Sequence, residues 1–161
     1  MAEDGRSRSR VPSMDGAPAR LLALATYLTT RTAAHAHRLV GEAFSATGAR
    51  GYHYRVLSAL AEFGPLSQAD LGRRIDVDRS DIVTAVNELA AAGQVERKPD
   101  PADGRRNLVT ITPAGREQLL RLDAALAQVQ ERFLAPLDDE ERVTYRALLA
   151  KLLAHHAGRA T

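Results

Sequence analysis

Two closely spaced helix starts are the feature that most constrains how this chain folds. The segments Leu66–Leu71 and Val77–Ile82 share one order of residue types: an apolar residue, a capping residue, an acid three positions later and a second apolar residue. A Ser or Asp at the cap accepts hydrogen bonds from free N–H groups of the first turn, while the two apolar residues pack together. The sequence therefore predicts two helices with helix-turn-helix spacing, the first ending near Arg74 and Ile75.

The second of these helices has two different faces. Asp78 is placed to cap it and Gly93 to end it, since glycine readily adopts the left-handed backbone of a helix C-terminus. An apolar stripe at helical spacing is formed by Ile82, Ala85, Val86 and Leu89. The opposite face carries the short polar side chains of Ser80, Thr84 and Asn87, which suit a helix lying in a DNA major groove. The alternative is an ordinary solvated helix face.

A basic hairpin follows the second helix. Gln94–Lys98 and Asn107–Ile111 have the apolar pattern of short strands, and the intervening Pro99–Arg106 has the proline and Asp-Gly chemistry of turns. Arg105 and Arg106 lie at the predicted tip, where they are placed to enter the narrow minor groove. The alternative is a solvated turn that keeps the hairpin soluble. A helix followed at once by a hairpin with a basic tip is the layout of a winged helix-turn-helix.

The segment Asp100–Arg106, DPADGRR, leading into Leu108–Gly115, LVTITPAG, resembles the wing of the MarR (multiple antibiotic resistance regulator) family. The two predicted helices resemble that family's helix-turn-helix, and the likeness covers about residues 18 to 156. It implies a mainly α fold with a small antiparallel β wing. A winged helix-turn-helix DNA-binding domain (51–111) would lie between the two parts of a helical dimerisation region (17–50 and 112–161). The resemblance also implies a homodimer of triangular shape, a palindromic operator in double-stranded DNA and, in many members, a small-molecule effector.

The resemblance further implies roles for individual residues. By position, Asp103 braces the wing and Arg105 probes the minor groove, while Arg79, Ser80, Asp81 and Thr84 face the major groove. The full expected DNA-binding surface is Ser67, Gln68, Arg73, Arg74, Arg79, Ser80, Asp81, Thr84, Asn87, Arg105 and Arg106. Many members have arginine at the position of Thr84, so their base preference does not transfer. The chain has no cysteine, which excludes the thiol-oxidation sensing of one branch of the family.

Bulk charge does not by itself favour DNA as a partner. The formal net charge is +2, and residues 51–111 hold eight Lys or Arg against nine Asp or Glu, a net charge of −1. Placement therefore has to supply the attraction to phosphate, by gathering basic residues on one side. Those residues are Arg73, Arg74, Arg79, Arg97, Lys98, Arg105 and Arg106. The acidic Asp81 is compatible with a reading helix, because a carboxylate accepts from cytosine N4.

Long apolar helices flank the winged segment. Pro18 suits the first turn of a helix that we expect to reach Thr47. We expect Thr112 to cap another helix, which Pro113 opens and which runs to about Leu134. A capping box at Asp138 and Glu141 starts a last helix. Its apolar residues include Leu148, Leu149, Leu152 and Leu153. These helices carry more apolar surface than a lone winged domain needs, so we expect them to form the dimer interface.

Polar aromatic residues mark a candidate effector site. Thr32 and His35 interrupt the apolar seam of the first long helix, and Tyr52, His53 and Tyr54 begin the helix that we expect over Tyr52–Phe63. The side chains of that helix expected to point inward are Val56, Leu57, Leu60 and Phe63. In the resembled family the effector crevice lies near this point. The alternatives are a hydrogen-bonded interface residue at His35 and simple aromatic packing at the helix junction. His35 and His37 point to different faces of a helix, which argues against a shared metal.

The remaining features bound the function class. Residues 1–16 read as a disordered arm, with a basic tail on DNA phosphate as the alternative. No secretory signal and no bilayer-spanning run is present, and the absence of cysteine fits a reducing cytoplasm, so we expect a cytoplasmic protein without membrane contact. No phosphate loop, nucleophile elbow or metal-ligand spacing appears, so we expect neither an enzyme nor a cofactor.

These features favour a homodimeric, sequence-specific DNA-binding regulator, a repressor of palindromic operators. The competing hypothesis is a winged-helix module that binds proteins and not DNA.

Overall fold

The computed structural model describes residues 16–104 and 106–157, and it is mainly α with a small antiparallel sheet, as expected. The expected arm over 1–16 lies outside the described residues except for Gly16, and Arg105 lies outside them as well. The elements, in chain order, are α1 (Ala19–Leu22), α2 (Ala25–Ala46), α3 (Gly51–Phe63), β1 (Leu66–Ser67), α4 (Gln68–Ile75), α5 (Arg79–Ala91), β2 (Val95–Pro99), β3 (Asn107–Ile111), α6 (Pro113–Phe133) and α7 (Asp139–Ala157).

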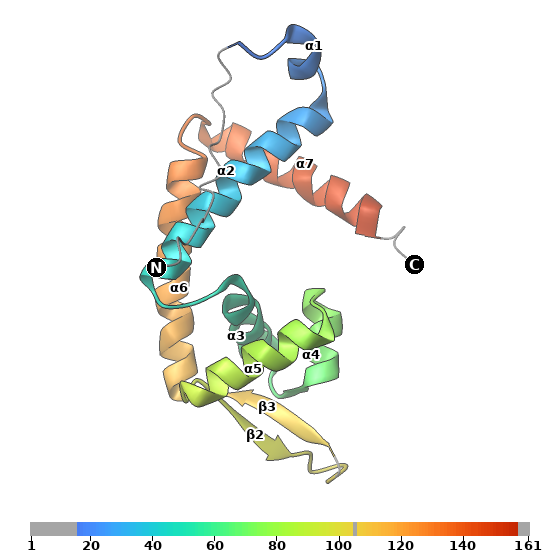
Figure 1. Ribbon diagram of the computed structural model, residues 1–161, viewed down its shortest axis with the longest axis vertical. Helices are drawn as coiled ribbons and strands as arrows, with labels where there is room; N and C mark the ends of the chain where they lie inside the picture. The colour runs from blue at the N-terminus through green and yellow to red at the C-terminus, as the bar shows by residue number, and fades with distance from the viewer. Residues whose placement is uncertain (1–15, 105, 158–161) are drawn as a thin grey trace, which may run out of the picture.

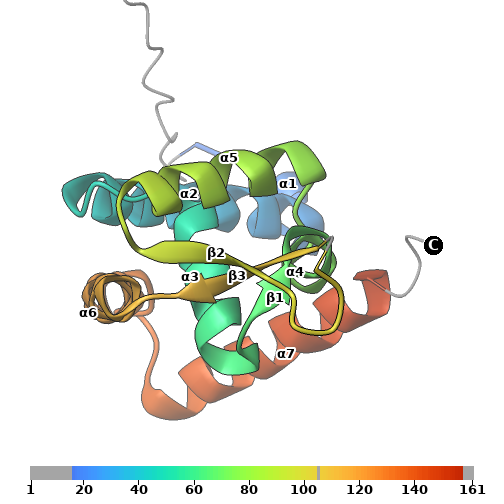
Figure 2. The same cartoon turned by 90° about the horizontal axis from the view of Figure 1, so that it is seen from below.

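The sheet is a hairpin with a short third strand along one edge. β2 and β3 pair antiparallel from Val95 opposite Ile111 to Pro99 opposite Asn107, which confirms the predicted hairpin. β1, which the sequence analysis did not predict, pairs with the other edge of β3. β1 has only two residues, which are too few to show the alternation of apolar and polar residues that predicts a strand. It is a strand only because it pairs with β3. Figure 2, seen from below, shows the three strands crossing beneath α3, α4 and α5.

The core lies where α3, α4, α5 and α6 meet the sheet. The predicted apolar stripe of α5 is buried, with Ile82, Val86 and Leu89 each no more than 1% exposed. The other large side chains that are fully buried include Leu57, Leu60, Leu71, Val109 and Leu122. Burying a side chain of this size stabilises the fold by about 1.5–3 kcal/mol. Burial of the apolar stripe also fixes the orientation of α5 about its own axis, so the opposite face of the helix is exposed to solvent.

Capping explains several of the helix boundaries. Ser67 caps α4 by accepting from Asp70 N–H (3.1 Å), and Thr112 caps α6 by accepting from Gly115 N–H (3.1 Å). Asp138 and Glu141 form the reciprocal pair of a capping box, at 2.9 and 3.0 Å. Gly93 ends α5 with a φ of +68°, as predicted. These local expectations are confirmed.

Two expectations about side chains were wrong. Asp78 occupies the N-cap position of α5, but its carboxylate accepts no cap hydrogen bond and instead lines a groove between α4 and the start of α5. Phe63 was expected to point inward, yet it is 47% exposed. It carries the Arg74 guanidinium 4.3 Å from the ring centroid, so a cation–π contact holds it at the surface.

The expected helix from Pro18 to Thr47 is in fact two helices. The backbone of Leu24 is extended (φ −93°, ψ 113°), and it separates α1 from α2. No glycine or proline occupies this point. Leu21 and Leu24 are 38% and 50% exposed, so little packing within the chain holds the first turn in line with α2.

The flanking helices extend away from the sheet, although the first half of α6 belongs to the core. α2 and α6 pack along each other, and α7 leaves the far end of α6 and reaches out across a gap from α4 (Figure 1). No described residue of α7 is buried. Within the described ranges, no helix is both long and apolar enough to cross a membrane.

Candidate nucleic-acid interface

The outer face of α5 is open and built from short side chains. Ser80, Thr84 and Asn87 are all exposed, and the Thr84 hydroxyl donates to the Ser80 carbonyl at 3.0 Å. Val83 beside them is 37% exposed. A helix with such a face approaches another surface to within direct hydrogen-bond distance, since no long side chain keeps the two apart. Asp81 differs from its neighbours, because it is half-buried against the groove that Asp78 lines.

The residues expected on α4 have different environments. Ser67 is buried, with its hydroxyl committed to the cap and to the Asp70 carboxylate, so its side chain is not open to a ligand. Gln68 is half-buried, and Arg73 and Arg74 are exposed. Arg74 lies on Phe63, while Arg73 pairs with the Asp70 carboxylate.

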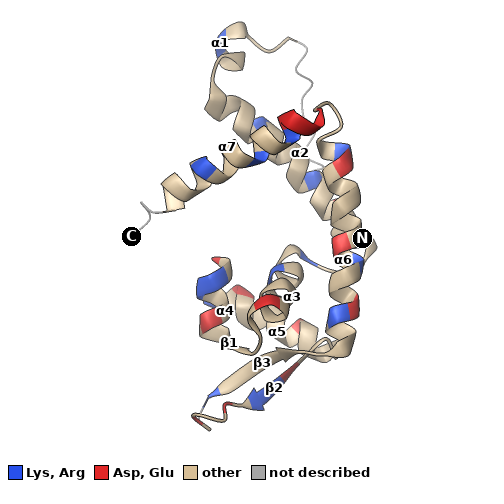
Figure 3. Cartoon of the chain, turned by 180° about the vertical axis from the view of Figure 1, so that it is seen from behind, with Lys and Arg blue, Asp and Glu red and all other residues tan. Residues whose placement is uncertain are grey.

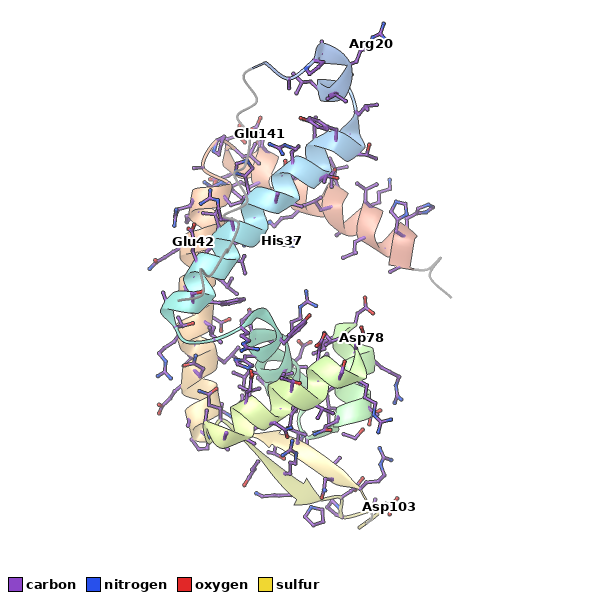
Figure 4. The ribbon with its side chains drawn as sticks, in the orientation of Figure 1. Arg20, His37, Glu42, Asp78, Asp103 and Glu141 are labelled. Carbon is purple, nitrogen blue, oxygen red and sulfur yellow. The ribbon has the colours of Figure 1, made fainter. Side chains whose placement is uncertain are left out.

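The hairpin turn is held by backbone hydrogen bonds. Asp100 N–H donates to the Arg106 carbonyl at 2.8 Å, and Arg106 N–H donates to the Asp103 carbonyl at 2.9 Å. The Asp100 carboxylate accepts from Ala102 N–H at 2.9 Å, as in an Asx turn. Asp103 lies at the far tip of the hairpin (Figure 4). The predicted bracing role of its side chain is not tested by these hydrogen bonds.

Basic and acidic side chains alternate over this surface. Figure 3 shows Lys and Arg on α4 and on β2, with Asp and Glu between them. Asp70 is the junction: its carboxylate accepts from the Ser67 hydroxyl at 2.6 Å, from Arg73, and from Arg106 Nη2 at 3.4 Å. The Ser67 hydroxyl, followed by the guanidinium groups of Arg73 and Arg106, holds the pKa of Asp70 below its usual range. Of the expected basic cluster, the structure therefore brings Arg73 and Arg106 together on one carboxylate.

The five residues of the expected effector site do not share one pocket. Tyr52 is 40% exposed and lines a groove of about 650 Å³ with Arg55, Arg73 and Arg79. Tyr54 points elsewhere, donating to Asp123 of α6 at 3.0 Å, and burial followed by this hydrogen bond raises its pKa. Thr32 and His35 are half-buried residues of α2, the helix that packs along α6.

His53 links α3 to α5 through a hydrogen bond that the sequence analysis did not predict. Its Nδ1 accepts from Arg50 N–H at 3.2 Å, so the neutral ring carries its proton on Nε2 and donates to Glu88 of α5 at 2.7 Å. A polar pocket of about 330 Å³ lies beside this pair. The partners are 35 residues apart, a separation at which no local periodicity signals a contact.

Comparison with known proteins gives the same class of molecule as the fold. A family model described as MarR family matches residues 47–106. The putative transcriptional regulatory protein for the hcr operon of Thauera aromatica is 39% identical over 99 residues, which are 62% of this chain and 60% of that protein. The HTH-type transcriptional repressor NicR of Pseudomonas putida is 35% identical over 97 residues, 60% of this chain and 61% of NicR. The chain thus spans about three fifths of the length of these curated relatives.

A solved structure extends the match over nearly a whole protein. The PcaV transcriptional regulator of Streptomyces coelicolor, in complex with its natural ligand, is 30% identical with a TM-score of 0.71. The match covers 83% of this chain and 94% of that one. Fold, hairpin and matches together define a winged helix-turn-helix protein. The chain belongs to the MarR family.

Proposed function

We propose that this chain is a homodimeric repressor that binds a palindromic operator and is released by a small-molecule effector. The proposal rests on two features that occur together in this chain. The exposed face of α5 carries short side chains, and the leucines of α7 are not buried. In this proposal, residues 51–111 bind DNA, and residues 17–50 and 112–161 hold two subunits together. The protein would act in the cytoplasm, on the nucleoid.

The exposed apolar residues support a dimer. Leu148, Leu152 and Leu153 of α7 are 56%, 54% and 71% exposed, and Leu24 and Leu28 at the other flank are 50% and 37% exposed. Such surface is unfavourable in water unless a partner covers it. A second copy related by a two-fold axis would cover it and place two α5 helices about 34–36 Å apart, one turn of DNA.

The DNA contacts follow from the two exposed elements of the winged part. Arg79, Ser80 and Thr84 on α5 would meet base edges and phosphates in the major groove, with Asn87 further along the same face. Arg105 and Arg106 would reach the minor groove from the hairpin. The repressor role is supported by the relative NicR, which is named as a repressor.

An effector is supported by the solved complex of PcaV with its natural ligand. In this chain, Tyr52 lines a groove at the junction of α3, α4 and α5, next to Arg79 of the proposed reading helix. A ligand there would change the position of α5 relative to the flanking helices. Such coupling is typically about 1–3 kcal/mol, or roughly 5- to 150-fold in DNA affinity.

Enrichment of bound fragments from the source genome, followed by anisotropy titration, tests this proposal. We expect one or a few fragments with inverted repeats, each binding two subunits, and at least about 1,000-fold preference over random duplex. If no fragment binds better than random duplex, the alternative of a protein-interaction module replaces the DNA-binding one.

Replacing both wing arginines, Arg105→Ala with Arg106→Ala, is expected to weaken the operator complex and to make its salt dependence shallower. Each phosphate that is no longer neutralised lowers the log–log salt slope by roughly 0.9, so four such phosphates per dimer would change it by about 3–4. Titrations between low and moderate salt measure the slope. The matched control replaces Arg20 and Arg132, two exposed arginines of α1 and α6, and should leave the slope unchanged. An unaltered slope in the wing variant would show that the hairpin does not contact DNA.

A further inference from the structure

Asp70 holds two basic side chains that come from different parts of the chain. It is the third residue of α4, and its two carboxylate oxygens are divided between partners. Oδ1 accepts from Arg73 of the same helix, while Oδ2 accepts from Arg106 at the base of the hairpin turn, 36 residues away. All three side chains are accessible, with 31%, 73% and 53% of the Asp70, Arg73 and Arg106 side chains exposed. One carboxylate therefore links the wing to the helix-turn-helix at the protein surface.

The fold does not require the charge of Asp70. The cap of α4 is made by Ser67 Oγ accepting from the Asp70 backbone N–H, at 3.1 Å. The Ser67 hydroxyl in turn donates to the Asp70 side chain at 2.6 Å, and a neutral amide oxygen would still accept that bond, although less strongly than the carboxylate does. The negative charge therefore adds to the helix start, and its pairing with two arginines is a separate contribution.

A carboxylate on these arginines competes with a DNA phosphate for the same N–H donors. Guanidinium groups bind both anions through the same pairs of parallel N–H donors. The Arg106 pair is long at 3.4 Å and exposed, and exposed ion pairs are weak, so a phosphate can replace it. Until that happens, the single negative charge of Asp70 offsets part of the positive charge of Arg73 and Arg106, in a domain that has a net charge of −1, and it repels the DNA backbone itself.

We propose that Asp70 is a positioning residue of the DNA interface, which holds Arg73 and Arg106 in the free protein and gives them up to phosphate on binding. This inference rests on the proposed function. The two pairs favour one position of the wing relative to α4 before DNA arrives, and they weaken contact with any duplex that does not bring phosphates to both arginines. Its main effect would therefore be to lower non-specific affinity.

The test uses the full chain and a fluorescent duplex of random sequence, titrated at several salt concentrations. Asp70→Asn is expected to bind this duplex roughly three- to tenfold more tightly than the wild type, with a steeper log–log salt slope, because two arginines become available to phosphate. Asp70→Gln is the second variant, in case the first does not fold. Glutamine is one of the residues favoured at the third position of a capped helix. Thermal unfolding of both variants checks the cap.

Asp76→Asn is the matched control. Asp76 ends α4 in a left-handed conformation that asparagine tolerates, and it pairs with no arginine in the part of the chain that the structure describes. The substitution removes one negative charge at the other end of the same helix, so it reports the effect of net charge alone. We expect a change of less than about twofold in affinity.

A double-mutant cycle with Arg106→Ala tests whether the higher affinity of Asp70→Asn comes from release of Arg106. Loss of Arg106 should weaken binding more in the Asp70→Asn background than in the wild type, a coupling that a purely structural role for Asp70 would not produce. Equal affinity of folded Asp70→Asn and wild type, or an equal gain from Asp76→Asn, would overturn the inference while leaving the proposed function intact. A wild type that binds no duplex even at low salt would overturn both.

Discussion

Gly115→Ala is expected to destabilise the protein by about 3 kcal/mol or more, at the upper end of the range for overpacked sites. A Cβ at this position would lie 2.0 Å from the Gln94 carbonyl oxygen and 2.8 Å from Ile111 Cγ1. The nearest obstacle is backbone, and it cannot turn aside, because the same carbonyl accepts from Thr112 N–H at 3.1 Å. The start of α6 would have to move away from the start of β2.

Thermal and urea unfolding measure the effect. For a chain of this length, a destabilisation of about 3 kcal/mol lowers Tm by roughly 6–12 °C. Gly41→Ala is the matched control: a Cβ at Gly41, inside α2, would have no atom within 4 Å, so alanine should be neutral or stabilising there. A Gly115→Ala protein that melts with the wild type would mean that α6 does not approach β2 this closely in solution.

Gly115 also shows what the sequence can and cannot reveal about such a site. The resemblance to the MarR wing included a threonine and a glycine three positions apart, and the threonine was expected to cap the helix. The cap is confirmed, since Thr112 accepts from Gly115 N–H. The need for glycine could not be inferred from the helix start, because the obstacle is a carbonyl 21 positions earlier, brought close only by the pairing of β2 with β3.

The same division holds elsewhere in the chain. Most features set by neighbours within one helical turn were predicted, as with the Ser67 cap and the Gly93 stop, because short-range chemistry decides them. The Asp78 cap is the exception, because its carboxylate accepts no cap hydrogen bond. Features set by distant partners were not predicted. β1 exists only because Leu66 lies opposite Val109, and Phe63 is exposed although it falls on the apolar side of α3 by spacing.

The candidate site follows this rule as well. The exposed face of α5 was predicted because its opposite is a regular apolar stripe, and burial of the stripe fixes the direction of both faces. The links of Asp70 to Arg106 and of Glu88 to His53 join residues 36 and 35 positions apart. No pattern within either helix predicts these links. They nevertheless decide which polar groups are hydrogen-bonded within the chain and which are open to a ligand.

Leu149→Gln combined with Leu152→Gln is expected to yield a folded monomer that has lost specific DNA binding. Under the proposed function, a dimer would bury four of these leucines, and each is worth about 1.5–3 kcal/mol. The dimer would therefore be weakened by about 6 kcal/mol or more, which corresponds to roughly four powers of ten in the dimer dissociation constant. Light scattering after gel filtration measures the mass, and anisotropy measures operator affinity.

This substitution separates assembly from folding. The two leucines are 38% and 54% exposed, and no described residue of α7 is buried within the chain. α7 is held to α6 near its start, where Arg142 pairs with Glu131 at 2.9 Å and Tyr145 lies beside Phe133. Glutamine keeps the helix propensity of the altered positions. The winged part should therefore stay folded, which circular dichroism of the variant checks.

Leu120→Gln provides the control for loss of an exposed leucine, since Leu120 is 68% exposed on α6. If this single variant stays dimeric and binds as the wild type does, the effect belongs to α7. One subunit offers DNA only a few short side chains on a domain of net charge −1, so it should keep weak, sequence-independent binding at most. A monomeric α7 variant that still binds its operator at wild-type affinity would show that one reading helix and one wing suffice, and that the leucines of α7 serve some other contact.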